Sequence, residues 1–356
     1  MKVGMVGLPF SGKTMLFEAI TGARASAASH DPSAHMATVA VPDERLDKIA
    51  ESVKPDKITY AHVDFVDVAG VGGEMKREQA VAILSSLRNV DGLVHVVRWF
   101  ESPSAPPHPH GSLDPKRDAA ELHAELIVAD LDIVERRMEK LQKQIAKFTN
   151  TLEHDKKELA LLQRLREALE EGKPVSALEL TSEESLMLRA FQFLSEKPML
   201  YVLNVHEDML NKPEAAAAAQ ALGPNTVIVS ARAEKDIAEL EPEERAEFLH
   251  DLGITEPAAR RVIQGCYRAL GLRSFFTAGE TDCRAWTVSA GDSALIAAGK
   301  IHSDIARGFI RAEVYGWKDF EELGDLKAAK AANRQRLEGK EYEVQDGDIM
   351  NIRFKV

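Results

Sequence analysis

The residues best suited to chemistry in this sequence form a short glycine-containing motif close to its first residue. The motif follows the pattern G-x-x-x-x-G-K-[ST] and consists of Gly7, Leu8, Pro9, Phe10, Ser11, Gly12, Lys13 and Thr14. The two glycines allow the backbone to turn its N–H groups inward around phosphate groups. Lys13 is placed to reach the β- and γ-phosphates, and the Thr14 hydroxyl is placed to bind Mg²⁺. The motif therefore predicts a nucleotide site with magnesium, in preference to an ordinary glycine turn.

A second motif, D-x-x-G, begins at Asp67 and ends at Gly70 after an apolar run. Asp67 could hold Mg²⁺ directly or through water, and Gly70 could meet the γ-phosphate. The motif is weak alone, but its place one strand after the phosphate loop favours this interpretation over an ordinary strand-ending aspartate. Val71 stands where many GTPases place a glutamine that orients the attacking water. An apolar side chain cannot orient water, so another group must do so, or hydrolysis is slow.

A third segment, Asn204 to Glu207, follows another apolar run. GTPases of this class usually carry N-K-x-D here, and the aspartate accepts hydrogen bonds from guanine. Val205 in place of lysine and Glu207 in place of aspartate leave guanine selectivity unassured. We expect Asn204, Val205 and Glu207 to contact the base, together with a later tripeptide similar to the S-A-K segment of GTPases: Ser230, Ala231 and Arg232.

These motifs need a sheet to bring them together. Apolar, β-rich runs occur at residues 2–7, 59–67, 92–97, 198–204 and 226–230. Nearly continuous apolar runs separated by helical stretches are typical of a parallel sheet that is covered on both faces. The sequence therefore predicts an α/β fold of the doubly wound type.

A different pattern, rich in Leu, Glu, Lys and Arg, interrupts the α/β region. Apolar residues recur at alternating spacings of four and three, which is a heptad seam: Ile127, Leu131, Val134, Met138, Leu141, Ile145, Phe148 and Leu152. A second stretch carries Leu162, Leu165 and Leu169 and stops at Gly172. Two such helices, joined near residues 150–155, predict an antiparallel coiled-coil hairpin whose seam packs on itself.

Composition narrows the class of protein further. The 356 residues suggest two or three domains, and the net charge of −12 argues against a chain coated in positive charge for gripping nucleic acid. Cys266 and Cys283 have no metal-site spacing and are expected to be small buried side chains. No apolar run approaches the length of a signal peptide or a membrane span. We therefore expect a cytoplasmic protein that contacts neither membrane nor DNA.

The three motifs, in this order and with a coiled-coil insertion before the third, resemble the YchF family of Obg-related P-loop NTPases. Residues 41–48, 94–98, 125–131 and 197–202 also resemble family stretches. The most specific likeness is to the family's C-terminal TGS domain, a β-grasp module, at residues 276–279, 284–287, 302, 307–314 and 345–348. The expected domains are residues 1–115 and 191–270 for the P-loop NTPase, 116–190 for the helical insertion and 271–356 for the TGS domain.

The resemblance implies a function as well as a fold. Several family members hydrolyse ATP, which agrees with Val205 and Glu207, and the family associates with ribosomes. Family members carry a histidine in the loop before the coiled coil that is proposed to replace the missing glutamine. Matching residues 111–115 to that loop assigns this role to His108, with His110 as its neighbour. A neutral imidazole can orient or deprotonate water, and simple solvation of an exposed loop histidine is the alternative.

Some segments depart from the family pattern. Phe10 and Ser11 stand where the family usually has Asn-Val, and the glycine-rich segment after Gly70 is shortened to residues 71–74. The switch threonine has no clear match: Thr38 is a candidate, and Asp31 occupies the ungapped position. Nucleotide binding is therefore a safer prediction than catalysis.

The leading hypothesis is a slow, ATP-preferring, Mg²⁺-dependent ATPase whose nucleotide state alters its contact with the ribosome or ribosomal RNA. In this hypothesis Lys13 and His108 are catalytic, and Thr14 and Asp67 hold the metal. The alternatives are a nucleotide-gated binding protein with negligible hydrolysis and a GTP-selective GTPase. Residues 327–340, with five Lys or Arg and one Glu, could form a basic face for RNA, although a solvated amphipathic helix explains them equally.

Overall fold

The computed structural model describes residues 1–22, 35–72, 75–103, 105–147, 152–254 and 256–355. The chain divides into two compact units. Unit 1 comprises Met1–Ala37 and Asp64–Val262, and unit 2 comprises Thr38–Val63 and Ile263–Val356. Residues 38–63, which the sequence analysis counts with the NTPase domain, thus group with the C-terminal part of the chain. Within the described ranges, no helix is both long and apolar enough to span a bilayer.

A six-stranded sheet, in the order β2-β4-β1-β5-β6-β7, positions the three motifs. Its strands are β1 (Lys2–Val6), β2 (His35–Ala40), β4 (His62–Asp67), β5 (Gly92–Trp99), β6 (Met199–Val205) and β7 (Val227–Val229). The neighbours from β4 to β7 pair in parallel. Strands β1, β5 and β6 are buried along most of their length, as their nearly continuous apolar sequences predict. Because β1 lies between β4 and β5, the sheet is doubly wound, which confirms the predicted fold class.

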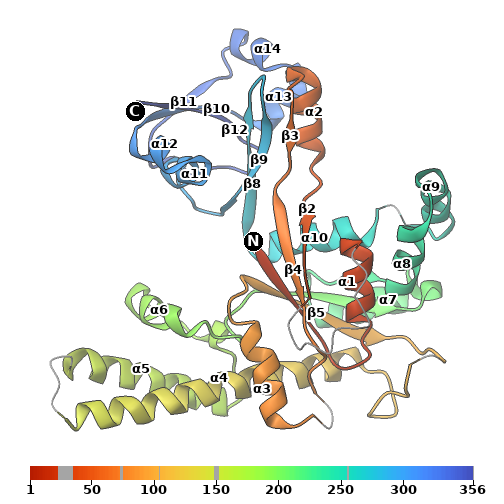
Figure 1. The fold of residues 1–356 in the computed structure, drawn as a ribbon, viewed down its shortest axis with the longest axis vertical. Helices are drawn as coiled ribbons and strands as arrows, with labels where there is room; N and C mark the ends of the chain where they lie inside the picture. The colour runs from red at the N-terminus through yellow and green to blue at the C-terminus, as the bar shows by residue number, and fades with distance from the viewer. Residues whose placement is uncertain (23–34, 73–74, 104, 148–151, 255, 356) are drawn as a thin grey trace. The chain divides into compact units, whose positions relative to one another are not determined.

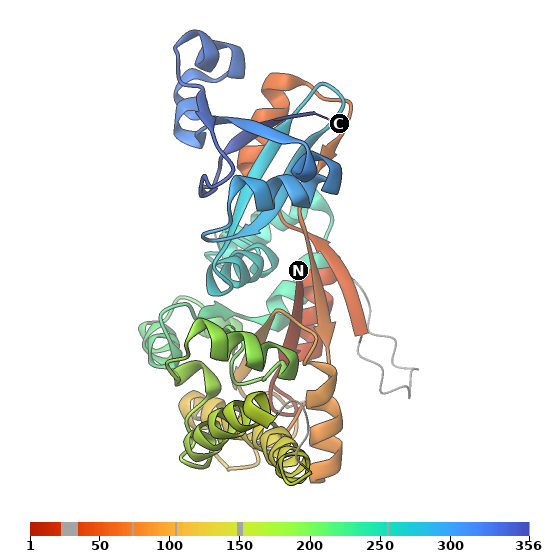
Figure 2. The same ribbon diagram turned by 90° about the vertical axis from the view of Figure 1, so that its left-hand side faces the viewer.

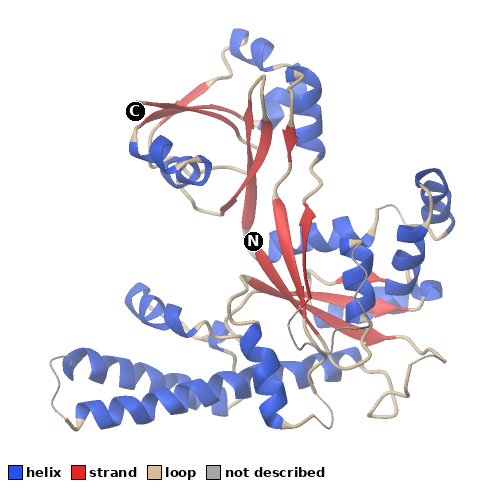
Figure 3. Ribbon diagram, in the orientation of Figure 1, coloured by secondary structure: helices blue, strands red, loops and turns tan. Residues whose placement is uncertain are grey.

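The helices of unit 1 flank this sheet (Figure 3). They include α1 (Lys13–Thr21), α3 (Arg77–Ser86), α7 (Pro213–Leu222) and α8 (Ala231–Glu239). Helix α9 (Pro242–Asp251) contacts α8, and α10 (Ala258–Ala269) crosses the boundary between the units. Left-handed glycines bound α1 at both ends, with φ of 85° at Gly12 and 66° at Gly22. Glycine reaches this region without the steric cost that a Cβ atom imposes. Helix α1 therefore starts directly behind the phosphate loop.

The predicted helical hairpin is present as α4 (Pro115–Ile145) and α5 (Leu152–Glu170), which lie side by side in both views (Figures 1 and 2). Asp114 caps α4 by accepting from the N–H groups of Lys116 and Arg117, and Pro115 occupies the first turn, where no N–H is needed. The short α6 (Ser182–Leu188) and three 3₁₀ turns, η1 (Val175–Ala177), η2 (Arg189–Phe191) and η3 (Glu207–Met209), complete the helical elements of unit 1 that the structure describes.

The heptad seam forms the buried interface of this hairpin, as predicted. Val134, Met138 and Leu141 pack with Leu162 and Leu165, and all have at most 4% of their surface exposed. Arg137 adds a two-point contact by donating to both carboxylate oxygens of Glu158, each at 2.7 Å. Phe148 and part of the expected turn, residues 148–151, lie outside the described residues.

Unit 2 contains a second six-stranded sheet, in the order β11-β10-β12-β8-β9-β3. Its strands are β3 (Ile58–Thr59), β8 (Leu272–Ala278), β9 (Cys283–Ser289), β10 (Phe309–Tyr315), β11 (Arg336–Glu338) and β12 (Ile349–Phe354). Helix α11 (Ala294–Ile301) packs its alanines against the core around Phe275 and Val314. This mixed sheet with a packed helix agrees with the predicted C-terminal β-grasp module.

The N-terminal segment of unit 2 contributes α2 (Glu44–Val53), which contacts β8 and β9. Arg45 at its start donates to Asp346 at 2.7 Å, and its guanidinium lies 5.3 Å from the centre of the Phe276 ring. Three short helices, α12 (Ser303–Arg307), α13 (Trp317–Leu323) and α14 (Leu326–Ala331), complete the described helices of the unit.

One strand prediction is wrong. Residues 59–67 are not one strand: the run breaks at Tyr60 and Ala61, so that β3 joins β9 of unit 2 whereas β4 joins β1. Both cysteines are free and buried, as predicted.

Candidate functional site

The carboxyl ends of the parallel strands bring the three motifs together in unit 1. The Val71 N–H donates to Gly7 O at 3.1 Å, which joins the segment after β4 to the phosphate loop after β1. The Asn204 amide, at the end of β6, donates to Ser11 O at 2.9 Å. Ligands of open α/β sheets bind at this edge, where the strand order reverses. The sequence-predicted motifs thus lie at one site.

The glycines of the loop are required by close contacts. A Cβ atom on Gly7 would lie 2.6 Å from Val96 O, and one on Gly12 would lie 2.1 Å from Asn204 Nδ2. A Cβ atom on Gly70 would lie 2.8 Å from the Pro9 Cα. These distances are shorter than any real carbon contact, so side chains at these positions would push the loops apart. The backbone cradle predicted for phosphate groups therefore depends on the absence of side chains.

Lys13, Thr14 and Asp67 form the polar centre of the site. Lys13 Nζ donates to Asp67 Oδ1 at 2.6 Å, and Thr14 Oγ1 donates to Asp67 Oδ2 at 2.9 Å. The Lys13 and Asp67 side chains are only 6% and 4% exposed, so each charge needs the other as its partner. A hydroxyl beside a carboxylate is the kind of oxygen pair that Mg²⁺ prefers, and a phosphate group is a suitable alternative partner for the ammonium. The residues present fit the predicted magnesium ion.

Asn204 braces the site from within the protein. Its Nδ2 donates to Ser11 O, and its Oδ1 accepts from the Ala231 N–H, both at 2.9 Å. Its side chain therefore connects the phosphate loop, β6 and the start of α8. Ser230 caps α8 by accepting from the Ala233 N–H. The expected contact of Asn204 with the base stays a prediction, since both ends of its amide already have protein partners.

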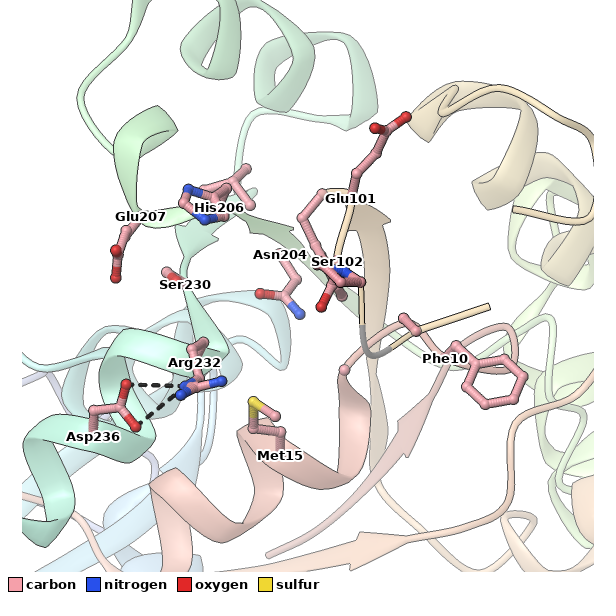
Figure 4. A pocket seen from close by; sticks show the side chains of 15 residues that line it. Phe10, Met15, Glu101, Ser102, Asn204, His206, Glu207, Ser230, Arg232 and Asp236 are labelled. Atoms are coloured by element: carbon pink, nitrogen blue, oxygen red, sulfur yellow. Dashed lines mark hydrogen bonds and ion pairs between the residues drawn. The ribbon is translucent and has the colours of Figure 1, made fainter. Parts of the chain in front are cut away.

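A pocket of about 480 Å³ lies beside these loops (Figure 4). It is lined by Phe10, Gly12, Met15, Phe100, Glu101, Ser102, Pro103, Ala105, Asn204, Val205, His206, Glu207, Ser230, Arg232 and Asp236. The volume suits a nucleotide base and sugar, since small-molecule pockets have volumes of roughly 300–1,000 Å³. The apolar part of the lining can cover a flat ring, and polar groups at the rim can read its edge.

The predicted base-contacting residues differ in what they present to this pocket. Glu207 is exposed at the wall, whereas the Val205 side chain is 2% exposed and packs in the core. Arg232 is held by Asp236, with Nε 3.0 Å from Oδ2 (Figure 4). Glu207 is therefore the predicted residue best placed to meet the polar edge of a base.

Phe10 is unusual within the phosphate loop. Its φ is 61°, in the left-handed region, and 61% of its surface is exposed. A residue other than glycine is uncommon there, and the conformation costs about 1–2 kcal/mol. Figure 4 shows its ring directed away from Asn204. The Phe10 side chain thus lies at the margin of the pocket, although its backbone belongs to the cradle.

His108 lies outside this pocket, in the loop between β5 and α4. That loop lines a separate hollow of about 560 Å³ together with Arg98. His108 Nε2 lies 2.9 Å from Asp118 Oδ2, and the two side chains are 6% and 3% exposed. The structure therefore holds His108 against α4, and the expected role of this residue with water stays a prediction.

Sequence reasoning missed several residues that line the pocket. Phe100, Glu101 and Ser102 follow β5 directly and belong to no named motif. Met15 lies one residue beyond the phosphate motif, on α1. The position of residues 100–102 after a predicted parallel strand was the signal that could have identified them, since all strand ends meet at one edge. The shortened glycine-rich segment and Asp31 fall partly or wholly outside the described residues.

This fold and site define a P-loop NTPase. The family model MMR_HSR1, described as a 50S ribosome-binding GTPase, matches residues 2–164, and YchF-GTPase_C, described as a protein of unknown function (DUF933), matches residues 272–355. The ribosome-binding ATPase YchF of Haemophilus influenzae is 42% identical, covering 100% of this chain and 99% of its own length. The chain belongs to the YchF family.

Two further relatives are similar to this chain over nearly its whole length. The ribosome-binding ATPase YchF of Bacillus subtilis is 41% identical to this chain. The alignment covers 99% of this chain and 99% of the relative. The solved structure of the Schizosaccharomyces pombe YchF GTPase is similar with a TM-score of 0.81 at 30% identity, covering 99% of this chain and 97% of that one. The helical hairpin and the C-terminal β domain thus belong to the shared architecture.

Proposed function

We propose that this chain is an ATP-preferring, Mg²⁺-dependent ATPase of the cytoplasm, and that its nucleotide state alters its contact with the ribosome. The observation that carries the proposal is the buried arrangement of Lys13, Thr14 and Asp67 next to a base pocket with Glu207 at its wall. The names of the bacterial relatives, which are ribosome-binding ATPases, support the same substrate and partner.

Each residue at the phosphate end has a definite part in the proposed reaction. Lys13 would exchange its Asp67 partner for the β- and γ-phosphates, and the backbone N–H groups between Gly7 and Thr14 would neutralise further negative charge. Thr14 and Asp67 would hold Mg²⁺, which supplies positive charge to the phosphate oxygens when bound. Gly70 lies against Pro9 and would bring its N–H to the γ-phosphate. The chain thus orients the phosphate groups and offsets their charge.

The preference for adenine rests on the base pocket. Glu207 can accept from the exocyclic amino group of adenine, and its side chain is one methylene longer than the aspartate that accepts from guanine in N-K-x-D. Val205 provides no lysine stem to cover a guanine ring. A pocket that holds a base by an apolar lining and few polar contacts distinguishes adenine from guanine only moderately. We therefore expect GTP to bind more weakly than ATP but still to bind.

A single-turnover assay with ATP and Mg²⁺ tests the proposal. The wild-type chain is expected to release phosphate, Lys13→Ala to abolish the release, and His108→Ala to lower it because His108 is the loop histidine proposed to assist the attacking water. The matched control is Lys2→Ala, which removes an amine from β1 of the same unit outside the site. Tight ATP binding without any phosphate release would instead indicate a nucleotide-gated binding protein.

A further inference from the structure

Arg98 carries a buried positive charge at the carboxyl end of β5. It is 5% exposed, and the part of the chain that the structure describes offers its guanidinium no carboxylate within ion-pair distance. A buried charge of this kind is costly unless hydrogen bonds replace those of water. Nε donates to Phe100 O and Nη1 donates to Pro106 O, both at 3.1 Å. Arg98 therefore holds the chain at two points of the loop after β5.

The chain between these two points, residues 100–103 and 105–106, forms the wall segment of the base pocket. Four of its residues line both the base pocket of about 480 Å³ and the hollow of about 560 Å³ that Arg98 also lines: Glu101, Ser102, Pro103 and Ala105. Because open volume lies behind the wall segment, packing alone does not hold it against the base pocket. The two hydrogen bonds from Arg98 supply that restraint.

Arg98 is also the direct neighbour of Asn204 in the sheet. The two residues are register partners in the parallel pairing of β5 with β6, and both are buried. Asn204 holds Ser11 of the phosphate loop and Ala231 at the start of α8, each at 2.9 Å. Arg98 holds the wall segment. Two adjacent buried side chains thus restrain three segments of chain around the base pocket.

Phe100 connects the wall segment to the phosphate loop. The Arg98 guanidinium carbon lies 5.1 Å from the centre of the Phe100 ring, a separation at which a cation is attracted to an aromatic face. The Phe100 Cε1 atom lies 3.7 Å from the position that a Cβ atom on Gly12 would occupy. A shift of Phe100 would therefore change the base pocket at the point where it meets the phosphate loop.

We propose that Arg98 is a positioning residue for nucleotide binding, which fixes the wall segment so that the base enters a preformed pocket; this inference rests on the proposed nucleotide site but not on which purine it prefers. Without Arg98 the wall segment loses two hydrogen bonds and has room to move into the hollow behind it. Ordering the segment around a base then costs binding free energy. The phosphate groups, bound by the loop from Gly7 to Thr14, do not depend on this segment.

The test uses calorimetric titration with Mg²⁺ and either a non-hydrolysable ATP analogue or inorganic tripolyphosphate, which has the phosphate groups but no base. We expect Arg98→Ala to weaken analogue binding by roughly 10-fold and to change tripolyphosphate binding by less than about twofold. Arg98→Lys keeps the charge but lacks the fork of donors that reaches both carbonyls, so it should lose most of the same affinity. If Arg98→Ala does not fold, Arg98→Lys decides by the same comparison.

Arg245→Ala is the matched control. Arg245 also donates to two backbone carbonyls of unit 1, from Nε to Leu240 O at 2.8 Å and from Nη2 to Ala238 O at 3.1 Å. It is not among the residues that line the base pocket. Arg245→Ala should therefore keep the wild-type affinity for both ligands.

The comparison of the two ligands separates a positioning role from general damage. Equal loss of analogue and tripolyphosphate binding in Arg98→Ala would overturn the inference, because it would show a disturbed phosphate loop. Wild-type analogue binding in Arg98→Ala would overturn it as well, since the wall segment would not depend on Arg98. Absence of phosphate release by the wild-type chain would contradict the proposed ATPase function, whereas a base-dependent loss in Arg98→Ala would still support the role of Arg98.

Discussion

At the scale of single residues, the site depends on buried polar groups that hold one another in place. Asn204, on β6, joins the phosphate loop to the start of α8 through one amide, and the Lys13–Asp67 pair is almost fully buried. Buried polar networks of this kind stabilise one arrangement of the loops because any unpaired member is costly. Substitutions here should therefore affect nucleotide binding through loop positions as well as through lost contacts.

His95 gives a prediction at this scale. It is 1% exposed on β5, and burial together with the nearby His123 lowers its pKa from 6.5 to about 3. Below pH 6.5 the unfolded chain binds a proton at His95 that the folded chain does not, so stability is present above pH 6.5 and is lost as the pH falls toward 3. Between pH 7 and pH 5 the protonation of His95 in the unfolded chain should lower the free energy of unfolding by about 2 kcal/mol.

Urea unfolding at pH 7 and pH 5 measures this effect. His95→Phe should lose clearly less stability between the two pH values than the wild-type chain. The control is His250→Gln, whose side chain is 91% exposed and which should keep the wild-type pH dependence. An unchanged pH dependence in His95→Phe would show that His95 is not the group responsible.

At the scale of elements, the helical hairpin owes its stability to its seam. Leu141 has no exposed surface and packs in the cluster that includes Leu161 and Leu165. Leu141→Ala should lower the free energy of unfolding of the hairpin by about 2–5 kcal/mol, because a cavity replaces the lost side chain. Hydrogen exchange along α4 and α5 measures the change locally.

Val128 on the same helix is the matched control. Its side chain is 39% exposed, and Val128→Ala should change stability by less than about 0.5 kcal/mol. Equal protection of the α4 and α5 amides from hydrogen exchange in Leu141→Ala and in the wild-type chain would contradict the packing described for the seam.

The elements that the sequence predicted well are those whose signals are local. The phosphate loop follows from eight consecutive residues, and the hairpin follows from a periodicity carried by the helices themselves. The break in residues 59–67 could not be seen in this way, because β3 pairs with Cys283 and Arg284, far along the chain. Which sheet a strand joins depends on distant partners, and those are absent from local patterns.

For the residues of the site, too, local sequence patterns predicted only part of the arrangement. Lys13 and Thr14 were predicted from the phosphate-loop motif and Asp67 from the D-x-x-G motif, because the residues within each motif are close together in the sequence. The distribution of the loop histidines between Asp118 and Glu121 depends on how α4 begins and on the path of the loop, neither of which a motif encodes. Phe100 was missed because an aromatic residue after a strand has no pattern of its own.

At the scale of the whole molecule, the one stretch whose charge suggested an RNA-binding face is residues 327–340. The basic stretch at residues 327–340 is less free than its charge count suggests, since Arg334 faces Asp319 at 3.5 Å and Arg336 faces Asp348 at 3.2 Å. These pairs favour the solvated interpretation of that stretch over a dedicated RNA face.

Ribosome association gives the prediction for the whole chain. If the nucleotide state controls contact with the ribosome, sedimentation with ribosomes should differ between an ATP analogue and ADP. The Lys13→Ala variant should lose this difference, since it no longer binds the phosphates. Identical sedimentation of the wild-type chain in both nucleotides would contradict a switch.

The central claim is that the site prefers ATP, and a competition titration tests it most directly. The protein, with Mg²⁺ and a fluorescent ATP analogue bound, is titrated with unlabelled ATP and, separately, with GTP. We expect ATP to displace the analogue at a clearly lower concentration than GTP does, and Glu207→Ala to reduce the difference between these two concentrations. Displacement by GTP at a lower concentration than by ATP would contradict the proposed ATP preference and identify a GTP-selective site.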